Sequence, residues 1–378
     1  MKSRFNKFGC AIVVFCTLFL FSSCNILSFP TDFSSVELKY ENNESRYYYN
    51  LLTNNAKTAY TLILDVIETH PQKIEVPSLT EEELNSVFLA LSYDNPSLLC
   101  LGATSELSSE GAKSYFIPEY SNDVTVCNQK TDELNKKTKS ILNSVSESYT
   151  EYEKELFVHD YICKNCVYDL NCDLSSGSTA YDALISGKTV CEGYARAAQL
   201  LLNELNIKNY LITGDAVNSD NVTESHMWNI VSIDGKNYHL DLTWDDYDET
   251  DENLSHSYFN LSDSVISANH FNFEPKENNC ISTDSNYFVK NGTYFDNYNS
   301  NVNNQIIKQA VKNINSGNAE IEISFSDKSA MDIAKKNLID DSEIFNLLGS
   351  INKRSKKNYK NIKYTLDESI NVLQFIFE

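Results

Sequence analysis

Apolar side chains recur every three or four positions in several segments, a spacing that is typical of helices with one buried face. The predicted helices cover residues 49–70, 80–93, 132–145, 155–167 and 193–205. Shorter apolar or alternating runs predict strands at 98–102, 114–118, 124–127, 210–216, 226–233 and 237–244. This mixture of helices and consecutive strands predicts an α+β fold.

The pattern changes after residue 273. It predicts a strand pair around an Asn291-Gly292 turn at 286–294, helices at 303–315 and 328–348, a strand at 319–325 and a closing hairpin at 363–377. This part carries no catalytic motif, so we expect a small C-terminal α/β domain at 274–378. The other predicted boundaries are a signal segment at 1–23, a flexible spacer at 24–45, an N-terminal helical or α+β region at 46–150 and a central domain at 151–273.

The first 23 residues have the composition of an export signal. Lys2, Arg4 and Lys7 precede a twelve-residue apolar run at 10–21, which is short for a membrane span. Small residues then precede Cys24, as in a bacterial lipobox. We expect lipid on Cys24 and a protein anchored outside the cytoplasmic membrane. The alternative is an ordinary signal peptide with an incidental cysteine.

Charge narrows the function classes. The chain has 31 basic and 53 acidic side chains, a formal net charge of −22. Such a chain repels phosphate backbones, so nucleic-acid binding is not expected.

Cysteine pairing is left open by the sequence. Seven of the 10 cysteines remain after the signal and the lipid site. In an oxidising compartment six of them could pair, including Cys100 with Cys127, and leave one reactive thiol. Cys163, Cys166 and Cys172 with His159 could instead form a zinc cluster, but they lie on a helical pattern and we expect no metal and no cofactor.

Cys191 lies where a helical pattern begins. The run Gly187-Lys188-Thr189-Val190-Cys191-Glu192-Gly193 leads into apolar positions at helical spacing. At a helix start, the dipole and the free N–H groups favour a thiolate and can stabilise an oxyanion. The alternative is a small buried apolar cysteine.

A histidine and an aspartate are brought together by hairpin register. Asp234-Gly235 is a strong two-residue turn signal between strands 226–233 and 237–244. With that turn, His226 faces Thr243, and Asp241 is its diagonal neighbour on the same side of the sheet. Cys191, His226 and Asp241 would then be nucleophile, base and orienting acid.

These segments resemble the transglutaminase-like superfamily of papain-like cysteine enzymes. The resemblance rests on GKTVCEGYA at 187–195, HMWNIV at 226–231 and YHLDLTWDD at 238–246, preceded by EKELFVHDY at 153–161. It covers residues 152–263 and implies a papain-like core, in which a nucleophile helix packs on an antiparallel sheet, and the triad Cys191, His226 and Asp241. Glu192 stands where many relatives carry glutamine.

Two functions are compatible with this triad. The first is acyl transfer through a Cys191 thioester, either hydrolysis of a peptide or amide bond or cross-linking of a glutamine to an amine, on a protein or peptide substrate of the cell envelope. Trp228, Tyr168 and Tyr181 are the expected substrate-lining residues. The second is a surface binding or scaffold protein that keeps the fold without turnover.

Overall fold

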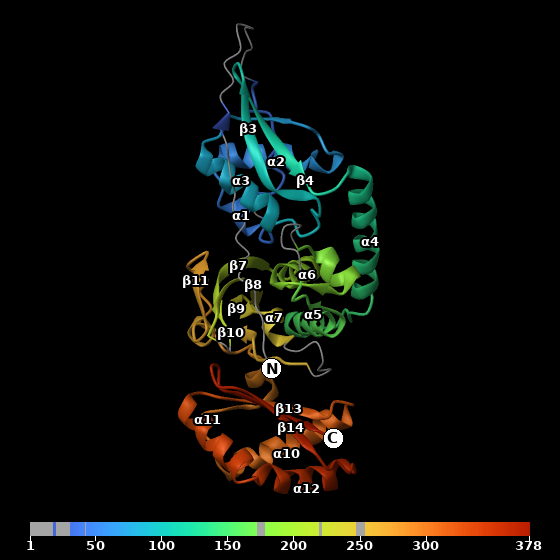
Figure 1. Ribbon diagram of the computed structural model, residues 1–378, viewed down its shortest axis with the longest axis vertical. Coiled ribbons are helices and arrows are strands. Elements are labelled where there is room, and N and C mark those ends of the chain that lie inside the picture. Colours follow the sequence, from blue (N-terminus) through green and yellow to red (C-terminus); the bar gives the residue numbers. More distant parts are fainter. Residues whose placement is uncertain (1–17, 20–30, 42, 172–177, 219–220, 247–253) are drawn as a thin grey trace. The chain divides into compact units, whose positions relative to one another are not determined.

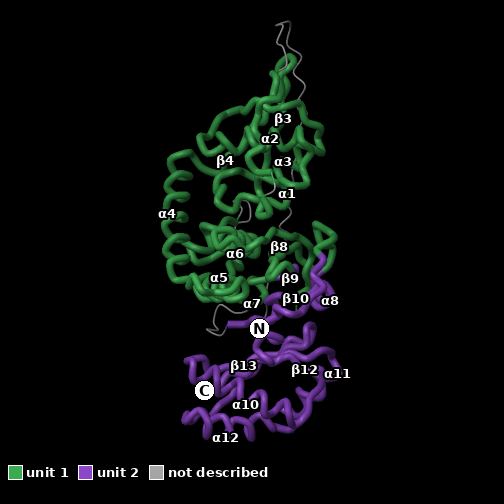
Figure 2. Tube along the Cα trace, turned by 180° about the vertical axis from the view of Figure 1, so that it is seen from behind, with its two compact units in different colours: residues 1–235, 241–252, 271–278 green, residues 236–240, 253–270, 279–378 purple. Residues whose placement is uncertain are grey.

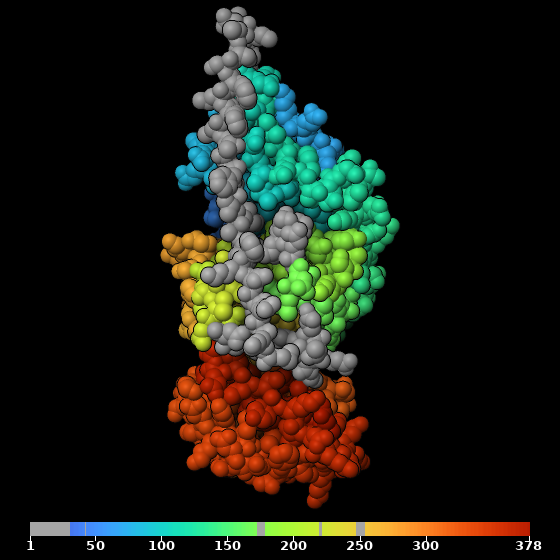
Figure 3. All heavy atoms as spheres, in the orientation of Figure 1, coloured from blue at the N-terminus to red at the C-terminus, as the bar shows by residue number. Residues whose placement is uncertain are grey.

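A computed structural model of the chain describes residues 18–19, 31–41, 43–171, 178–218, 221–246 and 254–378 (Figure 1; the other residues are grey in Figure 3). The chain divides into two compact units (Figure 2). Unit 1 comprises residues 1–235, 241–252 and 271–278, and unit 2 comprises 236–240, 253–270 and 279–378. Cys24 and Cys172 lie outside the described residues.

The N-terminal part of unit 1 combines three helices with a small sheet. The helices are α1 (Tyr47–Asn50), α2 (Asn54–Leu64) and α3 (Glu81–Tyr93). The sheet has the order β1-β3-β4-β2, from β1 (Leu18–Phe19), β3 (Leu101–Glu110), β4 (Lys113–Tyr120) and β2 (Ile74–Val76). Helix α3 starts at a reciprocal cap between Thr80 and Glu83, which confirms the predicted start.

Helix α4 (Val124–Leu142) corrects one predicted strand. Residues 124–127 are rich in β-branched side chains, yet the Asp123 carboxylate accepts from the N–H groups of Thr125 and Val126 and so starts a helix there. Cys127 in this helix is disulfide-bonded to Cys100. The pairing that the sequence left open is therefore present.

The central part of unit 1 is a helix packed on antiparallel strands. Helix α6 (Cys191–Glu204) lies against β7 (Asn209–Val217) and β8 (Thr223–Ile233), and α5 (Glu151–Asn165) lies against α6. A short parallel pair, β5 (Val167–Tyr168) with β6 (Lys188–Thr189), comes before α6, with a π-helical turn at Asp182–Ser186. Strands β7 and β8 pair in a register that places Gly214 opposite His226. This is the predicted α+β arrangement.

The turn after β8 confirms one prediction, and the next segment corrects another. Strand β8 ends at Ile233 and β9 (Lys236–Leu240) begins after Asp234 and Gly235, whose φ angles of 51° and 74° suit a type I′ turn. However, β9 stops at Leu240, whereas the pattern predicted a strand to residue 244. The Asp241 side chain caps the helix α7 (Leu242–Asp245) and so ends the strand.

Unit 2 contains the paired strands β9 and β10 (Phe259–Leu261) and a four-stranded C-terminal sheet. The pair of β9 with β10 is followed by α8 (Asp263–Ile266). The C-terminal sheet has the order β12-β13-β15-β14, from β12 (Tyr294–Phe295), β13 (Glu320–Phe325), β15 (Val372–Phe377) and β14 (Ile362–Asp367). Helices α10 (Ser300–Asn315), α11 (Lys328–Lys335) and α12 (Glu343–Ser355) supply the apolar side chains that pack with this sheet.

Two predictions for unit 2 were wrong. Residues 286–294 form helix α9 (Tyr287–Asn291) before β12, because Asn286 caps its first turn and Gly292, at φ 68°, ends it. The single helix predicted at 328–348 is broken between α11 and α12 by a π-helical turn, Lys336–Asp340, and by Ser342 at φ 60°. Strand β11 (His270–Glu274), most of which belongs to unit 1, is the neighbour of β7. Among the described residues, no helix has the length and apolar character that a membrane span requires.

Candidate active site

Cys191 is the first residue of α6, as the pattern predicted. In the first turn of the helix, the amides of Gly193 and Tyr194 donate to the Val190 carbonyl. The amides of Cys191 and Glu192 precede them, at the end of the helix where N–H groups have no acceptor within it. The Cys191 side chain is 5% exposed, so a reacting carbonyl there would be largely shielded from water.

The segment before Cys191 is fixed by close packing at Gly193. A Cβ atom at this position would lie 2.0 Å from the Thr189 hydroxyl oxygen, and no real structure accommodates such a contact. Glycine therefore allows Thr189, at the end of β6, to sit directly on the first turn of α6. This packing defines where the helix begins and so where Cys191 lies.

His226 on β8 connects the other two members of the predicted triad. Its Nε2 atom lies 2.7 Å from Oδ2 of Asp241, and its imidazole is also hydrogen-bonded to the Cys191 side chain. Burial opposes protonation of the imidazole, but the Asp241 charge and hydrogen bond, with the Cys191 contact, raise the pKa of His226 to about 10. The structure thus brings Cys191, His226 and Asp241 together.

Asp241 uses its two carboxylate oxygens for different contacts. Oδ2 bonds to His226, while Oδ1 accepts from the backbone N–H groups of Thr243 and Trp244 at 3.0 and 3.3 Å. The residue is fully buried. The start of α7 therefore fixes the orientation of the carboxylate that fixes the imidazole.

Two tryptophan rings flank His226. Trp228 stacks on the imidazole at 5.5 Å between ring centroids, and Trp244 lies tilted at 6.1 Å. Space for Trp228 comes from Gly214 on the paired strand, where a Cβ atom would lie 2.9 Å from the indole. Trp244 belongs to α7, beyond the end of β9. Trp228 is 1% exposed and packs beside the imidazole, and a role in substrate binding stays a prediction.

Tyr168 and Tyr181, the two tyrosines predicted to line the substrate site, each make a contact with a residue outside the predicted triad. The Tyr181 hydroxyl donates to Glu133 of α4 at 2.6 Å. The Tyr168 ring lies 6.5 Å from the Tyr194 ring. Substrate-lining roles for Tyr168 and Tyr181 therefore stay predictions.

Glu192, next to the nucleophile, forms a nearly buried ion pair with Arg196 at 2.9 Å. The Arg196 guanidinium also donates to the hydroxyl of Ser92, which lies in the last turn of α3. Because the Glu192 carboxylate is bound to Arg196 one turn along the same helix, it serves to hold the first turn of α6 against α3.

A second cysteine–histidine contact lies on α5. The Cys163 Sγ atom is 3.8 Å from His159 Nε2, and the Cys166 thiol donates to the Val167 carbonyl. Burial raises the pKa of Cys163 to about 11 and that of Cys166 to about 12, so both are neutral thiols near pH 7. The zinc interpretation of these residues stays untested, since Cys172 lies outside the described residues.

One metal-competent group lies within unit 2. The ligand atoms of His239, Asp263 and Cys280 lie within 4.8 Å of one another. The same residues are hydrogen-bonded together, with His239 Nε2 2.8 Å from the Asp263 carboxylate, which also accepts the Cys280 N–H. These bonds tie β9, α8 and the 280 region of unit 2 to one another.

A buried cysteine at a helix start, bonded to a strand histidine that an aspartate orients, is the arrangement of papain-like cysteine enzymes. The family model of the transglutaminase-like superfamily matches residues 139–242, so the chain contains a transglutaminase-like domain. No curated protein matches the chain.

Solved structures give weak overall similarity. A candidate cysteine protease from Cytophaga hutchinsonii is 22% identical with a TM-score of 0.25, and the match covers 29% of this chain and 37% of that one. A structure described as a TGase is 17% identical with a TM-score of 0.25, over 44% and 48% of the two chains. A candidate protease from Parabacteroides distasonis is 14% identical with a TM-score of 0.23, over 35% and 29%. This chain thus spans less than half of each of these structures.

Proposed function

We propose that the protein is a cysteine-dependent acyl-transfer enzyme that acts on a peptide or protein amide through a thioester on Cys191. The observation that carries the proposal is the position of His226, hydrogen-bonded to Cys191 and 2.7 Å from Asp241. The raised pKa of His226 supports an imidazolium that can pair with a thiolate.

The chemistry follows from these contacts. The Cys191 sulfur attacks the amide carbon, and the Cys191 N–H stabilises the oxyanion that forms. As the C–N bond breaks, protonated His226 gives its proton to the leaving nitrogen, so that ammonia or an amine departs and a thioester remains. Neutral His226 then takes a proton from water or from an incoming amine, the new C–O or C–N bond forms, and the Cys191 thiolate leaves. Water gives hydrolysis and an amine gives cross-linking.

Alkylation tests the activated thiol. We expect iodoacetamide near pH 7 to label Cys191 first among the described free cysteines, and the substitution His226→Gln to slow this labelling about 10- to 100-fold, because the thiolate loses its cationic partner. Peptide mass spectrometry on the folded full chain measures each site. Cys163 and Cys166, whose thiols are neutral near pH 7, are the internal controls.

A substrate probe then tests the acyl step itself. Glutamine-containing peptides should leave an adduct on Cys191 that survives an acid quench and is removed by hydroxylamine. Absence of this adduct would reject acyl transfer at Cys191 and favour the binding protein, whether or not labelling responds to His226→Gln.

We also propose that the protein is lipid-anchored at Cys24, outside the cytoplasmic membrane. The support is the basic, apolar and small-residue succession before Cys24. In a bacterial host, metabolic labelling with a radioactive fatty acid should mark the wild-type chain, and Cys24→Ala should remove the label. Equal labelling of the two proteins would contradict the anchor.

A further inference from the structure

The four-residue helix α7 connects the triad to a second buried pair in unit 1. Asp241 caps its N-terminus, and Asp245 is its last residue. A helix of one turn has too few hydrogen bonds to be stable alone, so its position depends on its neighbours. Helix α7 lies against both α5 and α6.

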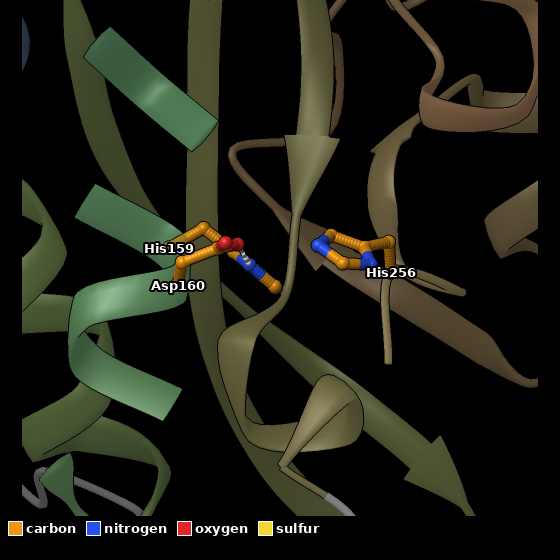
Figure 4. Close-up of side chains that lie close together, drawn as sticks. All are labelled: His159, Asp160 and His256. Carbon is orange, nitrogen blue, oxygen red and sulfur yellow. Dashed lines mark hydrogen bonds and ion pairs between the residues drawn. The ribbon is translucent and has the colours of Figure 1, made fainter. Parts of the chain in front are cut away.

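His159 of α5 makes the buried contact to the end of α7. Its Nε2 atom lies 3.1 Å from the Asp245 carboxylate, and both side chains are fully buried. Its Nδ1 atom lies 3.2 Å from Asp160, the next residue of α5 (Figure 4). His256, also drawn in Figure 4, belongs to unit 2. Burial lowers the pKa of His159, but Cys163, Asp160 and Asp245 together raise it well above its ordinary value.

The His159 group is not a second catalytic triad. Cys163 and Asp245 both meet the same ring nitrogen, Nε2, at 3.8 and 3.1 Å. In a triad the nucleophile and the acid must contact opposite nitrogens, so that a proton taken at one is balanced at the other. The Cys163 thiol also donates to the Leu242 carbonyl in α7. These contacts lead from α5 into α7.

We infer that the buried His159–Asp245 pair is a positioning device for the catalytic triad, because it holds the end of the helix whose start fixes Asp241. This inference rests on the proposed function, since it assigns a role at the same site. A directional buried pair fixes one point of α7 relative to α5 in a way that apolar packing does not. Both Asp241 and Trp244, which face His226, move with α7.

The test uses Asp245→Asn and Asp245→Glu in the full chain labelled with ¹⁵N-histidine. The first substitution removes the negative charge of the pair. The second keeps the charge but lengthens the side chain by one methylene, so that contact with His159 would require α7 to move. Both should slow iodoacetamide labelling of Cys191 about 10-fold or more, since a 1 Å misplacement at a reacting centre costs on the order of 10²-fold. Both should also shift or broaden the downfield proton signal of the His226–Asp241 hydrogen bond, which His226→Gln assigns.

Val158→Ala is the matched control. Val158 is buried in α5 beside His159, so this substitution lowers stability without touching the pair, and it should leave the labelling rate and the proton signal unchanged. If Asp245→Asn does not fold, Asp245→Glu decides on the same criteria. A folded Asp245 variant with wild-type labelling and an unchanged signal would overturn the inference. Neither readout requires turnover. If the wild-type protein forms no acyl-enzyme but the Asp245 variants change both readouts as expected, the proposed function is rejected and the positioning role of the pair is kept.

Discussion

Asp241→Asn is expected to lower kcat/KM for amide hydrolysis or transfer by about 10⁴-fold, the loss seen when the acid of a catalytic triad becomes an amide. Asparagine is a good helix cap, and its side-chain oxygen can still accept from the N–H groups that start α7. Its amide nitrogen, however, would donate toward Nε2 of His226, which then cannot carry its proton. Nδ1 would hold that proton and could not take one from Cys191.

The measurement is the initial rate of ammonia or amine release from glutamine and peptide-amide substrates, with substrate well below saturation. Asp241→Ala provides the comparison, because it loses the helix cap as well and should cost about 1 kcal/mol more stability than asparagine. A rate for Asp241→Asn within a few-fold of wild type would show that the carboxylate does not set the imidazole tautomer.

The proximity of Cys191, His226 and Asp241 was predictable because the position of each residue follows from a short-range pattern. The helical spacing after Gly193 places Cys191 at a helix start. The two-residue turn Asp234-Gly235 joins the strand that carries His226 to the next strand and so fixes how the two pair. The register argument for Asp241 reached the right contact by an incomplete route. It extended β9 beyond Leu240, although Asp241 is the cap of a helix.

The support of the triad was not predictable, since it depends on contacts between distant segments. The one-turn helix α7 gives no periodic signal, and its sequence continues the alternation of β9. His159 and Asp245 are 86 residues apart in the chain. The pattern placed His159 on a helix face but could not show which carboxylate meets it. The signal that could have found α7 is Asp241 itself, because aspartate is a preferred N-cap residue.

Local propensity misled the predictions at two places where a capping side chain starts a helix. The residues 124–127 favour a strand by composition, and Asp123 turns them into the start of α4. Asn286 does the same for α9. In both places a single carboxylate or amide satisfies two backbone N–H groups that a strand would have paired elsewhere, and this outweighs β propensity.

The protonated His226 has a second consequence, for stability. The two tryptophans of the chain, Trp228 and Trp244, both lie beside this imidazole. Their fluorescence therefore reports unfolding of unit 1 at the site itself. Asp241, which accepts from Nε2, stabilises the protonated imidazole in the folded protein.

We expect this contribution to be lost as the pH rises. The pKa of His226 is about 10 in the folded protein, against about 6.5 for an unfolded histidine. The folded state therefore binds more protons between these values, so the contribution is complete below pH 6.5 and falls as pH approaches 10. Urea unfolding at pH 6 and pH 10, followed by tryptophan fluorescence, should show the stability difference between wild type and His226→Gln shrinking by ~2–4 kcal/mol. Asp241→Asn should likewise flatten the pH dependence. Parallel pH profiles for wild type and His226→Gln would mean that folding binds no extra proton through His226, which would contradict the predicted pH dependence.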